Sequence, residues 1–349
     1  MNRSMIGFVA GVLSLVALQA RAWDLEVLVQ SARQEGTIDS IGMPDDWANW
    51  KGMWAAVSQK YGFRHQDTDM SSAQEIAKFG AEKSNATADI GDVGHAFGIV
   101  AVQKGIVQPF KPSTWDQIPD WAKDKDGNWV VAYTGSIAFI INRQLVKDPP
   151  RSWSDLAKGT YKVTLGDVGV ASQANNGVLA AAIALGGDEK NLAPALQLFS
   201  DLARQKRLSL NDPNIANLEK GEVEVGVLWD FNALNYRDKI DPARFSVVIP
   251  SDGSVIAGYT TIINKYARHP NAAKLVREFI LSDDGQILLA RGYARPIRSS
   301  VALPADVRAK LLPDADYGSV RPIKDFEAWE GMSKRLPRLW QEQVMVYLQ

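Results

Sequence analysis

The sequence predicts an α/β protein made of two doubly wound lobes that are joined by two β-strand crossings. Residues 37–104 alternate strand-like and helix-like segments, which is the pattern of a largely parallel sheet. A similar alternation covers residues 152–228. Two β-rich stretches, 130–142 and 245–263, separate these regions and would carry the chain back and forth across a hinge.

The individual elements follow from apolar periodicity and from helix-start signals. Ser72 and Glu75 have capping-box spacing, and Pro194 lies in a first helical turn, where a missing N–H is tolerated. Strands are expected at residues 37–43, 63–69, 88–93, 130–142, 161–165, 223–228, 245–249 and 259–263. Helices are expected at 48–61, 71–84, 96–104, 152–156, 176–185, 194–206, 270–281, 284–289, 304–312 and 323–347. Residues 23–131 and 257–349 are assigned to lobe 1, and 132–256 to lobe 2.

Residues 1–22 have the features of a cleaved signal peptide. Arg3 precedes an apolar run over 5–18, and Ala20-Arg21-Ala22 is an A-x-A cleavage site, so the mature chain is expected to begin at Trp23. The chain has no cysteine, which excludes a lipid-modified cysteine, a disulfide and a thiolate metal site. An exported but unlipidated protein needs an outer barrier to retain it, which predicts a Gram-negative periplasm.

Composition also limits the function classes. Without the signal peptide the chain carries 37 basic and 40 acidic residues, because Arg3 and Arg21 are removed from the 39. This mild deficit argues against a general nucleic-acid binder. The three histidines form no metal motif, and no nucleophile elbow, P-loop or dinucleotide fingerprint is present. We therefore predict no enzyme activity, no metal and no cofactor, and a monomer that binds a small solute.

The first group of candidate ligand contacts follows strands of lobe 1. The segment IGMPDDWANW, residues 41–50, places Asp45, Asp46 and Trp47 where a strand passes into a helix. Ligands gather at such strand ends, because backbone N–H groups and helix N-termini converge there. One of the two acids is expected to cap the helix and the other to face the pocket. Asp92 and His95 close the third strand in the same way.

The second group lies in lobe 2 and at the return crossing. Ser172 and Asn175 lie at a helix start, where capping and ligand binding are both open. Trp229 and Asp230 follow the buried strand 223–228 and are expected to face the cleft. Tyr259 begins the return crossing and either lines the cleft or packs in the hinge.

Several ordered motifs resemble the periplasmic solute-binding proteins of ABC importers, in the branch that serves ferric iron, thiamine, polyamines, phosphonates and phosphosugars. The most specific is HPNAAKLVREFILSDDGQ at 269–286, followed by GYARPI at 292–297. GEVEVGVLWDFNAL at 221–234 and the Pro-x-x-Trp-x-Asp-Leu helix near 149–159 are similar to second-lobe segments of that family. The resemblance implies a type II periplasmic binding protein-like fold, a cleft ligand and an ABC permease in the inner membrane as partner.

The ligand follows from the candidate residues rather than from the resemblance. Tyr236 stands alone where ferric members have two tyrosines, so direct iron binding is not expected. Acids and aromatic residues together favour an organic cation, such as a polyamine or a thiamine-like amine. The alternative is a phosphorylated sugar, polyol or phosphonate. Alternatives of other classes are a secreted hydrolase or lyase using Asp92, His95 and Asp230, and a chemoreceptor-associated sensor.

Overall fold

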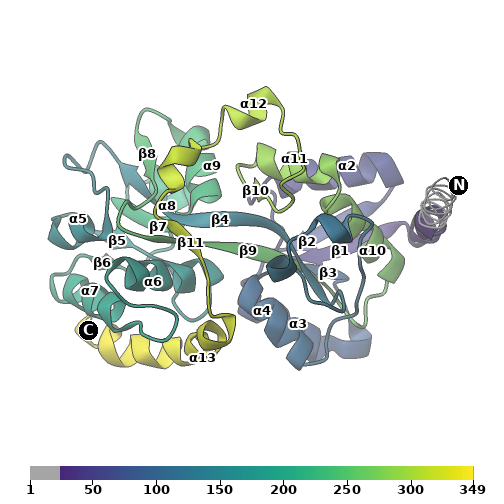
Figure 1. Cartoon of the computed structure of the whole chain (residues 1–349), viewed down its shortest axis with the longest axis horizontal. Coiled ribbons are helices and arrows are strands. Elements are labelled where there is room, and N and C mark those ends of the chain that lie inside the picture. Colours follow the sequence, from purple (N-terminus) through teal and green to yellow (C-terminus); the bar gives the residue numbers. More distant parts are fainter. Residues whose placement is uncertain (1–23, 349) are drawn as a thin grey trace, which may run out of the picture.

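The computed structural model describes residues 24–348, which fold into two α/β lobes joined by two long strands (Figure 1). These strands are β4 (Trp129–Asn142) and β9 (Ser254–Ile263). The predicted fold class is confirmed. The predicted signal peptide, residues 1–22, lies outside the described residues, and a helix over 24–35 opens the described chain.

One continuous sheet runs through both lobes in the order β2-β1-β3-β9-β4-β7-β5-β6. In the first lobe β1 pairs parallel with β2 and β3, and in the second lobe β5 pairs parallel with β6 and β7. Short strands β8, β10 and β11 add to β4 or β9. The bounds of these strands are β1 Thr37–Ile41, β2 Arg64–Thr68, β3 Ile90–Gly94, β5 Val163–Thr164, β6 Leu208–Ser209, β7 Val225–Trp229, β8 Phe245–Val248, β10 Arg295–Pro296 and β11 Val320–Pro322.

Strand β4 changes partners along its length and thereby links the lobes. Its first part, from Trp129 to Ser136, pairs antiparallel with β9, whereas Ile137 to Ile141 pair with β7. Every residue of β4 is buried, which explains its continuous apolar and β-branched sequence. Two crossing strands with different partners at each end form a connection about which the lobes can rotate.

Helices cover both faces of the sheet in each lobe (Figure 1). The longer ones are α2 Trp50–Tyr61, α3 Ser72–Glu82, α4 His95–Gln103, α6 Ser172–Ala184, α7 Ala193–Arg204, α9 Asp230–Ile240, α10 Pro270–Ile280, α11 Asp283–Arg291 and α13 Phe326–Gln343. The shorter ones are α5 Trp153–Lys158, α8 Ile215–Glu219 and α12 Ala305–Arg308, with 3₁₀ turns η1 to η5 at Lys83–Asn85, Trp115–Gln117, Asp120–Ala122, Asp314–Tyr317 and Met345–Tyr347.

Several predicted helix bounds shift in the structure. Helix α2 begins at Trp50 rather than at residue 48, because Ala48 and Asn49 have left-handed backbone angles, with φ of 47° and 62°. Trp50 and Trp54 face the core, as their helical spacing predicts. Helix α6 begins at Ser172, four residues before the predicted start at 176.

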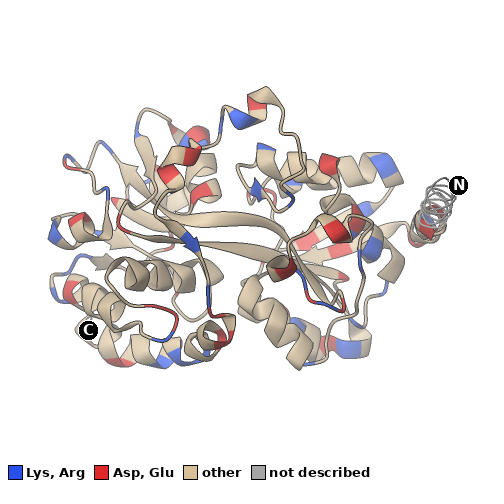
Figure 2. Cartoon of the chain, in the orientation of Figure 1, with Lys and Arg blue, Asp and Glu red and all other residues tan. Residues whose placement is uncertain are grey.

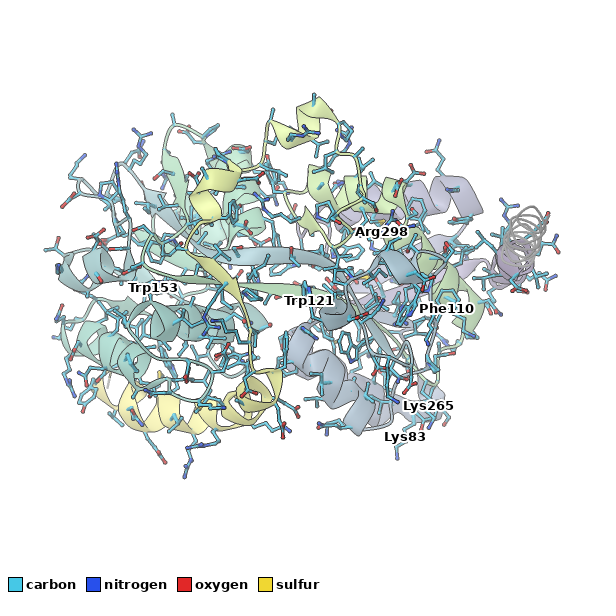
Figure 3. All side chains as sticks on the ribbon, in the orientation of Figure 1. Lys83, Phe110, Trp121, Trp153, Lys265 and Arg298 are labelled. Carbon is cyan, nitrogen blue, oxygen red and sulfur yellow. The ribbon has the colours of Figure 1, made fainter. Side chains whose placement is uncertain are left out.

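The C-terminal helix α13 packs mainly on the second lobe. Trp340 lies 5.3 Å from Phe199 of α7, measured between ring centroids, while Phe326 at the start of α13 lies 4.5 Å from His95 of α4. Trp121, labelled near the middle of the view in Figure 3, is a further neighbour of His95. The lobe boundaries at 131 and 256 stay a prediction, and α13 contacts residues on both sides of them.

The outer surfaces carry charges of both signs. Lys and Arg are interspersed with Asp and Glu over the peripheral helices and loops of both lobes (Figure 2). Within residues 24–348, none of the helices combines the length and the apolar character that a membrane span requires.

Candidate functional site

A cavity of about 300 Å³ lies where the strand ends of the first lobe face the start of α6 in the second lobe. Its residues come from three places: the loops after β1 and β2 together with the start of α3 and strand β3, the segments of lobe 2 at the start of α6 and after β6, and strand β9. They are Gly42, Pro44, Trp47, Asp69, Met70, Ser71, Ser72, Gln74, Glu75, Asp92, Ala171, Ser172, Gln173, Asp212 and Tyr259. This lining contains four carboxylates and no lysine, arginine or histidine among the described residues.

Glu75 lies at the buried end of this cavity with 1% of its surface exposed. Two glycines make room for its carboxyl group. A Cβ atom on Gly42 would lie 2.2 Å from Oε1 of Glu75, and one on Gly91 would lie 2.7 Å from Oε2. Gly42 also has a φ of +69°, which disfavours any other residue. Within the described chain, Oε2 of Glu75 has no hydrogen-bond partner.

The capping box at the start of α3 differs by one residue from the predicted one. The backbone N–H of Ser71 donates to Oε1 of Gln74 at 2.9 Å, so Ser71 and Gln74 cap the helix in place of Ser72 and Glu75. Ser72 Oγ instead accepts from the N–H of Gly94 at 3.0 Å, which ties α3 to the end of β3. Glu75 is thereby released from capping and enters the cavity.

Asp92 is the second buried acid of the cavity, with 2% exposure. Its Oδ2 accepts from the hydroxyl of Tyr133 at 2.6 Å, and that hydroxyl accepts from Nε1 of Trp47 at 2.8 Å. Its Oδ1 has no partner among residues 24–348. Burial raises the pKa of Asp92 and of Glu75 well above their usual values, and the charge of Asp92 raises the pKa of Glu75 further. Both carboxyl groups are therefore poorly solvated, and burial disfavours their charged forms.

Two more acids lie at the exposed mouth of the cavity. Asp69 follows β2 in the first lobe, and Asp212 follows β6 in the second. Partial desolvation raises the pKa of both, and the charge of Asp69 adds to the effect on Asp212. These two like charges approach each other from opposite lobes, so a cation between them would favour the closed arrangement.

Four of the ten predicted contacts line the cavity: Trp47, Asp92, Ser172 and Tyr259. Trp47 and Tyr259 meet edge to face, with ring centroids 5.5 Å apart, and form the aromatic part of the wall. Asn175 lies behind the wall, where its Oδ1 accepts from the N–H of Gly169 at 2.7 Å.

Trp229 and Asp230 lie deeper than predicted and do not line the cavity. Nε1 of Trp229 donates to the hydroxyl of Tyr259 at 3.1 Å, so Trp229 supports a wall residue from behind. Asp230 accepts from the N–H groups of Ser136 and Phe231, both at 2.9 Å, and from the hydroxyl of Tyr317 at 2.6 Å. With these three donors in place, the carboxylate of Asp230 is bonded within the protein.

His95 also lies outside the cavity. Its ring is buried and lies 4.6 Å from Trp129 and 4.5 Å from Phe326 between centroids. Burial among these rings lowers the pKa of His95 to about 4, so the imidazole is neutral at neutral pH. Asp92, His95 and Asp230 therefore do not form the shared site that the enzyme alternative requires.

Asp45 and Asp46 lie beside the cavity rather than in it. Asp45 is 3.9 Å from Nζ of Lys51, and both side chains are largely exposed. Asp46 forms an ion pair with Lys239, and its backbone oxygen accepts from Nδ2 of Asn235 at 2.7 Å, so it connects the first lobe to α9 of the second. Neither acid caps α2, whose N-cap residue is Asn49, so the capping prediction was wrong.

The sequence reasoning missed Asp69, Glu75, Gln173 and Asp212. Asp69 closes the predicted strand 63–69, and the same strand-end rule that selected Asp92 would have selected it. Asp212 follows the two-residue strand β6, which hydrophobic periodicity does not reveal. Glu75 has the spacing of a capping residue relative to Ser72, and this spacing favours a role at the helix start over one in the cavity. Gln173 follows Ser172 at the start of α6, which was expected to start later.

The described residues contain one group of potential metal ligands, outside the cavity: Asp39, Asp89 and His269. Its polar atoms already bond to one another. Nδ1 of His269 is 2.8 Å from Asp89 Oδ2, and Asp89 Oδ1 accepts from the N–H of His269 at 2.9 Å. Arg268 lies 3.4 Å from Asp39. This group joins the start of α10 to the sheet, which gives the HPNAA motif a structural role.

Comparisons with known proteins agree with this architecture. The profile of a family described as bacterial extracellular solute-binding protein matches residues 85–330. An uncharacterized protein from Haemophilus influenzae is 28% identical over 311 residues, covering 83% of this chain and 85% of that protein.

Solved structures with the same fold include periplasmic binding proteins. The periplasmic binding protein AfuA from Actinobacillus pleuropneumoniae, bound to fructose-6-phosphate, has a TM-score of 0.74 at 19% identity and covers 88% of this chain and 98% of its own. Iron-bound HitA from Pseudomonas aeruginosa scores 0.67 at 18% identity, over 86% and 98%. The spermidine/putrescine ABC transporter substrate-binding protein PotD from Streptococcus pneumoniae scores 0.66 at 15% identity, over 90% and 99%.

Proposed function

The chain belongs to the bacterial extracellular solute-binding protein family, and from this premise we propose that it binds an organic cation, a polyamine or a thiamine-like amine. The cleft would close on this solute in the periplasm and deliver it to an ABC permease. The proposal includes a mature, unlipidated monomer that begins at Trp23 after signal-peptide cleavage, and it assigns no catalytic role.

The lining of the cavity is the observation that carries the proposal. Glu75 and Asp92 each offer a buried carboxylate oxygen without a partner in the described chain. An ammonium group donating to such an oxygen forms a charge-assisted hydrogen bond, with a net contribution of about 1.5–3 kcal/mol. The aromatic side chains of Trp47 and Tyr259 belong to the same lining and would cover the apolar stem of an amine.

A phosphorylated sugar, polyol or phosphonate remains the competing ligand class. The start of α6 would suit an anionic group, and AfuA has the same fold and is bound to a sugar phosphate. Four carboxylates and the lack of a cationic side chain in the described lining count against an anion, because like charges repel strongly at short range. The cation is therefore the better supported ligand.

Calorimetry on refolded, ligand-stripped protein tests the proposal. Spermidine, putrescine and thiamine are titrated against hexose phosphates and phosphonates, and at least one amine should bind saturably without turnover. Asp92→Asn should weaken that binding by about tenfold or more, as expected for a lost charged contact. Asp230→Asn is the matched control, because Asp230 is equally buried but lies outside the cavity. Binding of the anions alone would overturn the proposal.

A further inference from the structure

Two helices begin at the cavity, and they differ in how their first N–H groups are satisfied. Helix α3 is closed by its own capping box of Ser71 and Gln74. Helix α6, thirteen residues long, has Ala171 at its N-cap and receives no capping hydrogen bond from a side chain. Its first-turn N–H groups therefore remain available to an acceptor, and the positive end of the helix dipole points the same way.

Gln173 presents a second donor on the same wall. Its Oε1 accepts from the backbone N–H of Trp229 at 3.1 Å and from Nδ2 of Asn232 at 3.3 Å. A backbone N–H is only a donor, so the atom beside it must be the amide oxygen. Nε2 is thus the remaining polar atom of Gln173, a residue that lines the cavity, and it has no partner among the described residues.

The two lobes therefore offer opposite hydrogen-bonding chemistry to a ligand. The first lobe supplies acceptors, the side chains of Glu75 and Asp92, which line the cavity and each have one buried oxygen without a partner among the described residues. The second lobe supplies donors, from Gln173 and the start of α6. We propose that the ligand is an organic cation that also carries an oxygen acceptor, and that this acceptor binds the second lobe while the ammonium group binds the first. This inference rests on the proposed function and narrows its ligand class.

The acceptor is assigned as neutral, a hydroxyl or carbonyl oxygen. Asp212 is also a second-lobe residue of the lining, and three further carboxylates line the first lobe. A ligand carboxylate would lie among four acidic side chains without a cationic side chain from the described lining to balance its charge. A second ammonium group in the ligand, in turn, would face N–H donors and the positive helix end, which repel its charge and offer it no acceptor to donate to.

Four ligands of equal chain length separate these cases: 1-aminobutane, 4-amino-1-butanol, 4-aminobutanoate and 1,4-diaminobutane. By calorimetry, the amino alcohol should bind about tenfold more tightly than the monoamine and more tightly than the other two. Gln173→Glu keeps the oxygen that Trp229 needs and removes the amide donor, so the tenfold preference should fall towards one. Gln144→Glu is the control. It makes the same substitution at an exposed second-lobe position outside the cavity lining and should keep the preference.

Each other outcome has a defined meaning. Tightest binding of 1,4-diaminobutane, or an unchanged preference in Gln173→Glu, overturns the inference and leaves the cation proposal standing. Tightest binding of 4-aminobutanoate overturns the neutral assignment. If the amines all fail to bind while glucose 6-phosphate binds, the proposed function itself fails. The wild-type series alone decides the point if Gln173→Glu does not fold.

Discussion

Replacing Glu75 by glutamine should make the ligand-free protein more stable and its cation binding weaker. Glu75 is 1% exposed, and its Oε2 has no partner among the described residues. Glutamine has the same shape without the charge. An unpaired buried group costs about 1–3 kcal/mol when neutral and more when charged, so the neutral amide removes the excess cost of the charge, taken here as about the same size. We therefore expect the free energy of unfolding at pH 7.5 to rise by about 1–3 kcal/mol.

The same substitution predicts a temperature shift and an affinity loss. With roughly 2.1 cal/mol/K of unfolding entropy per residue, a chain of this length gains about 1.5 °C in Tm for each kcal/mol. The expected increase is therefore about 1.5–4.5 °C in a ligand-free thermal melt. Loss of one charge-assisted hydrogen bond, about 1.5–3 kcal/mol, should weaken amine binding by roughly 10- to 150-fold in calorimetry.

The pH dependence gives this prediction a sign. Burial raises the pKa of Glu75, so the folded protein holds a proton that the unfolded chain releases near pH 4.3. Stability from this group is therefore present at low pH and is lost as pH rises from about 4.3 towards the raised pKa. Glu75→Gln has no such group to deprotonate. Its gain in free energy of unfolding over the wild type should therefore be larger at pH 7.5 than at pH 5.

Glu189 provides the matched control for Glu75, because it is a buried glutamate whose carboxylate is paired. It is 4% exposed, its carboxylate lies 2.7 and 3.1 Å from Arg321, and hydrogen bonds to Arg321 and Lys324 lower its pKa. Glu189→Gln should lower the Tm and leave amine affinity unchanged. A lower Tm for Glu75→Gln together with unchanged affinity would refute the reasoning and make Glu75 a structural residue.

Three further predictions concern residues around the cavity. Asp230→Asn should lower the free energy of unfolding by about 1–3 kcal/mol in a denaturant titration, because it disturbs the bond to Tyr317. A tenfold loss of cation affinity would instead place Asp230 in the site. His95→Phe keeps the ring contacts and removes an imidazole whose pKa is lowered from 6.5 to about 4 by burial. The free energy of unfolding of this variant should therefore fall less between pH 6.5 and 4.5 than that of the wild type. An equal fall in both proteins would contradict the prediction. Lys239→Ala removes an exposed ion pair with Asp46 that links the two lobes and is expected to contribute about 0–1 kcal/mol. Because salt screens exposed charges, ligand release measured by stopped flow should become faster at low salt and stay unchanged at high salt.

The fold was predictable because its signals are repeated and local. Alternating strand and helix patterns, two long β-rich crossings and the helical spacing of Trp50 and Trp54 each specify an element or a buried face without distant contacts. Strand β6 has two residues and helix α9 a weakly amphipathic sequence, so periodicity gave no sign of either.

The site was predictable only in part, because distant residues decide which strand-end acids stay open. Asp92 and Asp230 follow buried strands in the same way. Asp92 keeps one oxygen without a partner among the described residues, whereas Asp230 accepts a hydrogen bond from the hydroxyl of Tyr317, 87 residues further along the chain. Glu75 shows the same limit. Ser71–Gln74 and Ser72–Glu75 have equal capping-box spacing. The space beside Gly42 and Gly91, far away in the sequence, accommodates the buried side chain of Glu75, and Gln74 caps the helix.

The placement of the acids also explains how a cation would favour closure. Glu75 and Asp92 are contributed by the first lobe alone, so an amine held there gains most of its charged contacts from one side. Asp69 and Asp212 come from opposite lobes, and closing an empty cleft brings their like charges together. A bound cation reverses the sign of that interaction. It therefore lowers the free energy of the closed form more than that of the open form, and this difference is what a ligand needs in order to shift a conformational equilibrium.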